Sequence, residues 1–311
     1  MRSILALALL AAPAAHAETN LTLMLDWFVN PDHAPIVLAE ELGYFADAGL
    51  AVEVVTPSDP NDPPRMVAAG RADLAISYQP QLHLSRHQDL PVIRVGTLIE
   101  TPLTCLVVLA ESEIETPADL AGRKVGFAVA GVQEVMLDAM LADDGLEPGD
   151  VEQINIGWSI SPALMSGQVD GVIGAFRNFE LNQLRLEGRE GRCLYPEAHG
   201  IPAYDELIYI ANPDRMDRAA VGAFLAATAR ATDFMKNRPD EAWKIFSETA
   251  SELQTPLNEA AWSDTWPRFS SRPAAVDADR YLAFEAFLAE RGATPGGLAL
   301  SDLAIDVNEV E

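Results

Sequence analysis

The chain has 311 residues, of which 49% are hydrophobic and 22% are charged, so it is long enough to form two medium-sized domains with separate cores. Acidic residues outnumber basic residues by 47 to 21, which gives a formal net charge of −26. Because so acidic a surface repels phosphate groups, the composition argues against a protein that binds nucleic acid or anionic membranes.

The N-terminus has the features of a secretory signal peptide. Arg2 precedes an apolar run over residues 4–15, and the small residues Ala15 and Ala17 mark a cleavage site. The apolar run is too short to span a bilayer, which takes about 20 residues. We therefore expect residues 1–17 to be removed and the mature protein to reach the periplasm, with no direct insertion into the membrane.

The first part of the mature chain alternates short apolar strands with helices. Strands are predicted over residues 21–25, 51–55 and 73–77, with helices over residues 33–43 and 65–69 between them. This alternation is typical of parallel strands connected by right-handed helical crossovers.

The alternation continues to about residue 176, and the last third of the chain is mostly helical. Further strands are predicted over residues 92–98, 105–109, 124–128, 155–158, 169–176 and 207–211. Helices are predicted over residues 117–120, 130–141, 162–165 (capped by Ser161), 219–236, 240–251 and 277–291. No repeat of 20 to 50 residues is present, which excludes a solenoid.

This pattern predicts an α/β protein with two lobes. Each lobe is expected to be a mostly parallel sheet flanked by helices, and the two lobes to be joined by a two-strand hinge. The first lobe would comprise residues 18–104 and 206–311, and the second residues 105–205.

The only cysteines, Cys105 and Cys193, lie 88 residues apart. In an oxidising compartment they could form a disulfide, but two buried free thiols are equally compatible with the sequence. Two cysteines and scattered histidines show no zinc-ligand spacing, so we expect no metal site.

Four segments carry a resemblance to a known family: LDWFVNPDHAPIVLAEELGYFADAGLAVEVV, AAGRADLAISYQPQ, DLAGRKVGF and GIPAYDELIYIAN. Over roughly residues 20–290, the chain resembles the type-II periplasmic solute-binding proteins of ABC importers. The LDWF-x-NPDH segment and the later YDEL are similar to a narrower branch, which binds thiamine-precursor pyrimidines and is related to the fungal pyrimidine synthase. The other segments are general to importers of many small solutes.

The resemblance implies a ligand site between the lobes, at the carboxyl ends of parallel strands. We expect Trp27 and Tyr78 to stack on a flat ring, and Glu206 to bind an exocyclic amine and the ring nitrogen beside it. Asn30 and Asn178 would contact the remaining edge. The full set of candidate ligand-binding residues is Trp27, Asn30, His33, Tyr78, Gln79, Ala130, Gly131, Asn178, Glu180, Tyr204 and Glu206.

Several of these residues also have a purely structural interpretation. Trp27 could cover the core, and His33 could cap a helix or hold the loop. Glu180 could complement the dipole in the first turn of a helix. Tyr204 and Glu206 could belong to the hinge alone.

An enzyme related to the fungal synthase is the alternative class. That chemistry needs a lysine that forms a Schiff base with pyridoxal phosphate. The mature chain has only Lys124, Lys236 and Lys244, and none lies at the end of the strand over residues 73–77, where the family's lysine is expected. We therefore expect no catalytic residue and no cofactor.

The resemblance also implies partners. We expect a monomer that closes on a small heterocyclic solute and delivers it to an ABC permease and its ATPase complex. Two other solutes fit the same fold: another flat molecule such as riboflavin, or an alkylsulfonate. The loop at Ala130 and Gly131 could receive a sulfonate at a helix N-terminus, but it has no neighbouring lysine or arginine.

Overall fold

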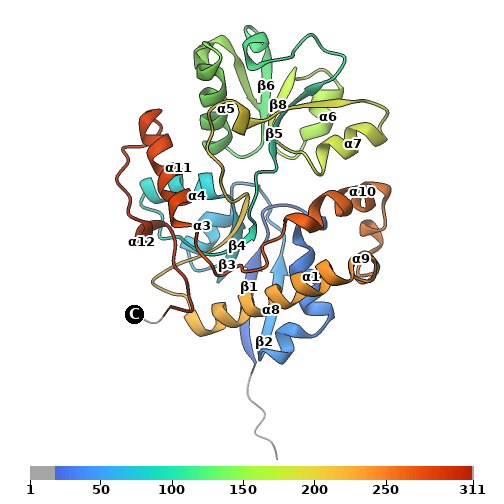
Figure 1. Ribbon diagram of the computed structural model, residues 1–311, viewed down its shortest axis with the longest axis vertical. Helices are drawn as coiled ribbons and strands as arrows, with labels where there is room; N and C mark the ends of the chain where they lie inside the picture. The colour runs from blue at the N-terminus through green and yellow to red at the C-terminus, as the bar shows by residue number, and fades with distance from the viewer. Residues whose placement is uncertain (1–17, 310–311) are drawn as a thin grey trace, which may run out of the picture.

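The computed structural model describes residues 18–309, and the predicted signal peptide over residues 1–17 lies outside this range. The chain folds into two α/β lobes (Figure 1). Each lobe is built on one five-stranded sheet. No helix among the described residues is long and apolar enough to cross a membrane.

The sheet of the first lobe has the strand order β2-β1-β3-β10-β4. These strands are β2 (Leu50–Val55), β1 (Thr19–Met24), β3 (Leu74–Ser77), β10 (Leu207–Ala211) and β4 (Ile93–Ile99). Strand β1 runs parallel to β2 and β3, whereas β10 runs antiparallel to β3 and β4. Strand β10 is the segment that returns from the second lobe, which explains its reversed direction.

Helices from both ends of the chain cover this sheet. They are α1 (Ala34–Glu41), α2 (Tyr44–Asp47), α3 (Pro63–Ala68), α4 (Gln79–His87), α8 (Arg218–Asn237), α9 (Pro239–Glu248), α10 (Pro256–Thr265), α11 (Ala278–Glu290) and α12 (Leu300–Leu303). Helix α8 begins where the Asp217 carboxylate accepts hydrogen bonds from the N–H groups of Ala219 and Ala220. Its buried Phe224 stacks on Phe45, with ring centroids 5.3 Å apart, and so joins the two ends of the chain in one core.

The sheet of the second lobe has the order β7-β6-β8-β5-β9. Its strands are β7 (Glu152–Asn155), β6 (Lys124–Phe127), β8 (Gly171–Phe176), β5 (Thr104–Leu109) and β9 (Gly191–Leu194), and its helices are α5 (Val132–Asp143), α6 (Ile160–Met165) and α7 (Glu180–Leu186). Single 3₁₀ turns are η1 (Pro31–His33), η2 (Pro117–Leu120), η3 (Pro148–Asp150), η4 (Pro196–Ala198), η5 (Ser251–Leu253) and η6 (Trp266–Arg268).

The predicted two-lobed α/β fold is confirmed, with differences in detail. Both sheets are mixed, because two of the four strand pairings in each are antiparallel. The strand predicted over residues 155–158 is β7, three residues earlier. Ser161 lies inside α6, whose N-cap is Ser159. Strand β9 and helices α2, α4, α10 and α12 were not predicted, and the predicted lobe limits stay a prediction.

The two cysteines, for which the sequence left two possibilities open, form a disulfide between Cys105 and Cys193 with their Cα atoms 5.4 Å apart. Cys105 lies on β5 and Cys193 on its neighbour β9, where Cys193 is in register with Val107. The bond therefore fastens the edge strand of the second sheet to the strand beside it.

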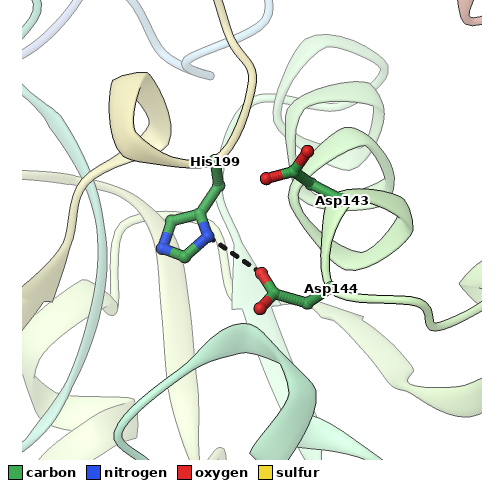
Figure 2. A group of neighbouring side chains, drawn as sticks. All are labelled: Asp143, Asp144 and His199. Carbon is green, nitrogen blue, oxygen red and sulfur yellow. Dashed lines mark ion pairs between the residues drawn. The ribbon is translucent and has the colours of Figure 1, made fainter.

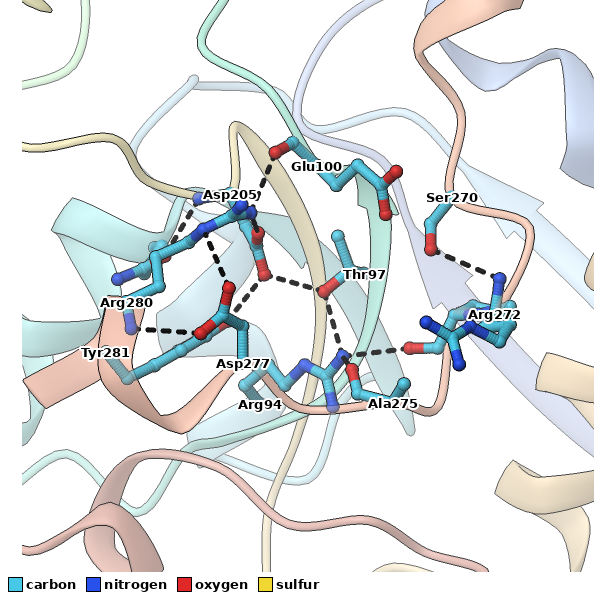
Figure 3. Close-up of polar contacts among 12 residues, drawn as sticks. Arg94, Thr97, Glu100, Asp205, Ser270, Arg272, Ala275, Asp277, Arg280 and Tyr281 are labelled. Carbon is cyan, nitrogen blue, oxygen red and sulfur yellow. Dashed lines mark hydrogen bonds and ion pairs between the residues drawn. The ribbon is translucent and has the colours of Figure 1, made fainter.

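The chain crosses between the sheets after β4 and again before β10. Hydrogen bonds of buried charged side chains hold the return crossing in place. The Asp205 carboxylate accepts hydrogen bonds from Thr97 Oγ1 at 2.7 Å and from the Arg280 guanidinium (Figure 3). Arg94, which is fully buried, donates to Thr97 Oγ1 and to the carbonyl oxygens of Pro273 and Ala275. This network ties the crossing to the segment before α11.

Helix α11 belongs to the C-terminal part of the chain, yet it packs against the core of the second lobe. Its Phe284, Phe287 and Leu288 are buried in one apolar cluster with Met136 and Met140 of α5. A third segment, besides the two crossings, thus links the lobes.

Candidate ligand-binding site

A cavity lies where the carboxyl ends of parallel strands from both sheets meet. Its volume in this conformation is about 30 Å³, well below the roughly 300–1,000 Å³ of small-molecule sites, so the lobes must move apart to admit a solute. The segments that follow β1 and β3 form one wall, and those that follow β6 and β8 form the other. The lining consists of Asp26, Trp27, Asn30, Asp32, His33, Tyr78, Ala128, Val129, Gln133, Ile160, Gly174, Phe176, Phe179 and Glu180.

Asp26 is the centre of the wall that the first lobe contributes. One of its carboxylate oxygens lies 2.9 Å from His33 Nε2, and the other accepts the Tyr78 hydroxyl at 2.8 Å. His33 Nδ1 accepts the N–H of Asn30, so Nε2 carries the proton that it donates to Asp26. Burial raises the pKa of Tyr78 well above its usual value, and the Asp26 charge adds to this, so the hydroxyl stays a donor. These side chains hold one another in place.

Asn30 is also largely engaged within its own loop. Its Oδ1 accepts the N–H of Asp32 at 2.7 Å, and its Nδ2 donates to the carbonyl oxygen of Phe28. It is the N-cap of η1, where it closes a capping box with His33. The NPDH segment therefore encodes a rigid turn that aims Asp32 at the second lobe.

The Asp32 side chain connects the two lobes through a hydrogen bond. Its Oδ1 accepts a hydrogen bond of 2.6 Å from Asn178 Nδ2, and Asn178 also donates to Thr265 Oγ1. Burial raises the pKa of Asp32 to about 6, an effect that His33 and the Asn178 hydrogen bond reduce. Asn178 lies outside the cavity lining, and both of its N–H groups are used, whereas its Oδ1 has no hydrogen-bond partner among the described residues.

Glu180 is the carboxyl group of the second lobe that lines the cavity. Its Oε2 accepts the N–H of Phe176 at 2.6 Å, at the point where β8 ends. Burial, with a contribution from the nearby Asp32 charge, raises the pKa of Glu180 to about 8, although the hydrogen bond from Phe176 lowers it. Glu180 is therefore mostly protonated at neutral pH and can both donate and accept a hydrogen bond.

Three aromatic rings meet across the gap between the lobes beside the cavity. Trp158, which follows β7, lies against Trp27 with ring centroids 4.2 Å apart and against Phe28 at 4.8 Å. Trp27 lines the cavity, whereas Phe28 is 55% exposed. One surface of Trp27 is thus covered by Trp158, a contact that sequence reasoning did not predict.

The cavity includes five of the predicted ligand-binding residues, namely Trp27, Asn30, His33, Tyr78 and Glu180. The other predicted residues lie outside the lining. Gln79 is buried and accepts the N–H of Asp205. Ala130 and Gly131 line a separate crevice, where their N–H groups donate to Asn61 and Glu134.

Glu206 and Tyr204 also lie outside the cavity lining, and the solute contact expected for Glu206 stays a prediction. The Glu206 carboxylate accepts hydrogen bonds from the backbone N–H groups of Leu103 and Thr104, from Thr104 Oγ1 and from the Tyr204 hydroxyl. These contacts join the outgoing and return crossings. Oε2 accepts three of these hydrogen bonds and Oε1 accepts one, so the protein itself uses most of the acceptor sites of this carboxylate at the hinge.

The residues expected from the sequence did not include Asp26, Asp32 or Gln133, which line the cavity. Asp32 carried a signal, because it follows a strand in the same turn as Asn30. Gln133 carried little signal, since it lies one turn into a predicted helix and only the folded chain brings its side chain into the cavity lining.

The residues give little support to a cofactor or metal in this cavity. Lys124, Lys236 and Lys244 are absent from its lining. Among residues 18–309, one group of three metal-capable side chains lies close together, Asp143, Asp144 and His199, with ligand atoms within 4.8 Å (Figure 2). It lies at the C-terminal end of α5, away from the cavity, and Asp144 is paired with His199 at 2.8 Å. We assign it no role.

The two lobes, the mixed sheets and the cavity at the strand ends define a periplasmic binding protein fold. The periplasmic aliphatic sulphonate binding protein SsuA from Escherichia coli shares this fold with a TM-score of 0.71, at 17% sequence identity over 94% of each chain. At that identity the similarity establishes the fold alone.

Sequence comparison then assigns the family: residues 30–242 match the family described as NMT1/THI5 like, and the chain belongs to it. A protein of Haemophilus influenzae named for thiamine biosynthesis is 48% identical over 94% of this chain and 93% of its own length. The formylaminopyrimidine-binding protein of Halalkalibacterium halodurans is 36% identical over 78% of this chain and 74% of its own. A 4-amino-5-hydroxymethyl-2-methylpyrimidine phosphate synthase of Legionella pneumophila is 26% identical, over 84% of each chain.

Proposed function

We propose that this protein is the solute-binding component of an ABC importer and captures a thiamine-precursor pyrimidine of the formylaminopyrimidine or hydroxymethylpyrimidine type. The cavity between the lobes would enclose the solute, and the closed protein would deliver it to a membrane permease with its ATPase. The 36% identity to a formylaminopyrimidine-binding protein supports this solute class.

The observation that carries the proposal is the position of the Glu180 carboxyl group, which is buried in the cavity lining and receives one hydrogen bond from the backbone, at the N–H of Phe176. In a 4-aminopyrimidine, an amine donor and a ring-nitrogen acceptor lie side by side. A carboxylic acid matches that edge with two parallel hydrogen bonds, because one oxygen accepts from the amine while the hydroxyl donates to the ring nitrogen. The pKa of about 8 keeps the proton available at neutral pH. Glu180 thus takes the role that sequence reasoning gave to Glu206.

The aromatic residues of the cavity lining suit a solute with a flat ring and a polar edge. Tyr78, Phe176 and Phe179 supply aromatic surface, worth about 0.5–1.5 kcal/mol per ring pair beyond burial. Micromolar binding requires about 8 kcal/mol, so stacking needs the burial of the ring and the two hydrogen bonds of the neutral Glu180 carboxyl in addition, at roughly 0.5–1.5 kcal/mol for each hydrogen bond.

The alkylsulfonate alternative fits this cavity poorly. Asp26, Asp32 and Glu180 line it, and its lining has no lysine or arginine among the described residues. A sulfonate would therefore meet carboxyl groups with no neighbouring cation, which is unfavourable in a buried site. Riboflavin stays a competing flat solute for direct test.

The remaining parts of the proposal concern location and assembly. We propose a periplasmic monomer, exported by cleavage of residues 1–17, with no enzymatic activity and no cofactor. The absence of a lysine from the cavity lining supports a binder over a synthase that needs a Schiff base. The acidic net charge of −26 supports a partner other than nucleic acid.

Calorimetry of the purified mature protein tests this function directly. The ligand panel is formylaminopyrimidine, hydroxymethylpyrimidine, riboflavin and taurine. We expect micromolar or tighter binding of a pyrimidine and none of taurine. Binding of taurine or riboflavin alone would reject the pyrimidine assignment. Absorbance near 415 nm after addition of pyridoxal phosphate, about the wavelength of a Schiff base, would instead favour an enzyme.

A further inference from the structure

Gln133 is the cavity residue whose side-chain orientation the backbone dictates. Its Oε1 accepts the N–H of Ala128 at 2.8 Å and the N–H of Val129 at 3.0 Å. A flipped amide would place NH₂ hydrogens against these two donors, so the assignment of oxygen and nitrogen is fixed. The Nε2 group must therefore point the other way, as a donor.

A glycine in the neighbouring strand makes room for this amide. A Cβ atom on Gly174 of β8 would lie 2.1 Å from Gln133 Nε2, and Gly174 has a φ of +90°, which side chains rarely adopt. Gln133 and Gly174 both line the cavity, and Gln133 is only 8% exposed. The position of the amide is thus set from two sides, by the loop after β6 and by the backbone of β8.

The amide nitrogen of Gln133 is not used by the protein. Within residues 18–309, no side chain or carbonyl group accepts a hydrogen bond from Nε2, and this atom is not sealed from the cavity. Three of the other polar groups in the lining are carboxyl groups, and the donor groups of Asn30, His33 and Tyr78 are already used within the protein. A directed donor therefore stands in a cavity otherwise dominated by Asp26, Asp32 and Glu180.

We propose that Gln133 Nε2 donates a hydrogen bond to an acceptor atom of the solute and so selects its substituents. This inference rests on the proposed pyrimidine-binding function. The required solute is then a flat heterocycle with an amine and ring-nitrogen edge for Glu180 and a separate acceptor, either a second ring nitrogen or a carbonyl oxygen, for Gln133. A solute that presents a donor at that position meets the Gln133 N–H and is rejected.

The variant Gln133→Glu separates this role from a structural one. The new carboxylate keeps an oxygen to accept the N–H groups of Ala128 and Val129, which favour its ionised form, as does its place in the first turn of α5. Folding is therefore retained. The atom that faces the cavity changes from a donor to an acceptor, so affinity for formylaminopyrimidine should fall at least about tenfold.

Two further variants complete the test. Gln133→Met removes the donor without adding charge, and it should also lose about tenfold in affinity, together with some thermal stability. Gln81→Glu adds the same charge outside the cavity and keeps the oxygen that accepts the Ser77 hydroxyl, so it should bind within about twofold of wild type.

The readouts are the dissociation constant from calorimetry and the melting temperature of each variant. Equal affinity of wild type, Gln133→Glu and Gln133→Met would overturn the inference, and so would a loss confined to Gln133→Glu, which would mean repulsion alone. If wild type bound none of the pyrimidines, the proposed function itself would be rejected, and this inference with it. An analogue with an amine in place of the formyl group shows which acceptor Gln133 contacts. A smaller effect of Gln133→Met on that analogue identifies the carbonyl, and an equal effect identifies the ring nitrogen.

Discussion

The two walls of the cavity differ in how their polar groups are used. On the wall from the first lobe, Asp26, His33 and Tyr78 bind one another, and Asn30 caps its own turn. On the wall from the second lobe, Glu180 uses one oxygen for the Phe176 N–H, and Gln133 uses only its oxygen. The first wall is a prearranged platform. The second wall carries Glu180 and Gln133, which can still form hydrogen bonds with a solute.

This difference bears on the role of the segment over residues 25–33, which gathers more polar and aromatic side chains than a connecting loop needs. These side chains mainly form a rigid surface, because most of their polar atoms are hydrogen-bonded within the segment or to Tyr78. Such a surface lowers the cost of ordering side chains on binding. Recognition of individual solute atoms then falls to the second lobe, which meets the solute as the lobes close.

The largest expected effect comes from removal of the Glu180 carboxyl group. Glu180→Leu removes both hydrogen bonds to the aminopyrimidine edge and should lower affinity by about 100-fold or more. Glu180→Gln can still accept with its oxygen and donate with its amide, so it should bind within about tenfold of wild type. Calorimetry of both variants tests this. Equal losses for Leu and Gln would show that an ionised carboxylate, rather than a protonated acid, binds the solute.

Disruption of the platform should have an intermediate effect. Asp26→Asn places an amide where two donors, from His33 and Tyr78, now meet a carboxylate. We expect a loss of about 1–3 kcal/mol in the free energy of unfolding, with an affinity loss of about tenfold. Urea denaturation and calorimetry measure the two quantities. Unchanged stability with lost binding would mean that Asp26 contacts the solute directly.

The hinge carboxyl group Glu206 offers the matched comparison with Glu180. In Glu206→Gln the amide oxygen can still accept from the backbone N–H groups of Leu103 and Thr104, and the amide N–H can donate to the Thr104 hydroxyl. The free energy of unfolding should therefore fall by only about 1 kcal/mol or less. Affinity per folded molecule should change little. If Glu206→Gln stayed stable and lost pyrimidine binding, the assignment of the solute amine to Glu206 from the sequence would be restored.

The unliganded protein should also lose stability as pH rises. The pKa of Glu180 is about 8 when folded and near 4.5 when unfolded, so the folded state holds more protons between these values. The free energy of unfolding then falls by about 1.4 kcal/mol per pH unit across that window. Asp32 contributes with the same sign from 3.8 to about 6. Urea denaturation from pH 5 to 8.5 should show this slope, and Glu180→Gln should flatten it above pH 6.

The smallest expected effect concerns the aromatic contact between the lobes. Trp158→Ala removes the rings' contacts with Trp27 and Phe28, worth about 0.5–1.5 kcal/mol each. If the contact stabilises the closed form, dissociation should become about three- to tenfold faster. Stopped-flow fluorescence measures this rate. A faster association with no change in dissociation would show instead that the contact obstructs entry.

The sequence predicted the order of elements, because apolar periodicity and glycine or proline breaks mark most of them. It also located the cavity, since Trp27, Tyr78 and Glu180 follow strands whose carboxyl ends converge. It could not show which polar groups the protein itself satisfies. The partners of Glu206 lie 102 and 103 residues away, and those of Asn178 lie 146 and 87 residues away, so only the folded chain shows that they are engaged.

The role of Gln133 could not be predicted from the sequence either. Its role depends on two backbone N–H groups in the preceding loop and on the absence of a side chain at Gly174, 41 positions later in the printed sequence. Neither condition has a local sequence signature. The pairing of Cys105 with Cys193 was similarly open until β5 and β9 were seen to be neighbours.

The most direct test of the central claim is the pH dependence of pyrimidine affinity in wild type and in Glu180→Gln. If the solute binds the protonated carboxyl of Glu180, the dissociation constant for formylaminopyrimidine should be nearly constant below about pH 8, given the pKa of about 8. Above that value it should rise about tenfold per pH unit, because binding then requires uptake of a proton. Glu180→Gln should show no such rise. An unchanged wild-type affinity up to pH 9.5, or the same rise in both proteins, would contradict the account.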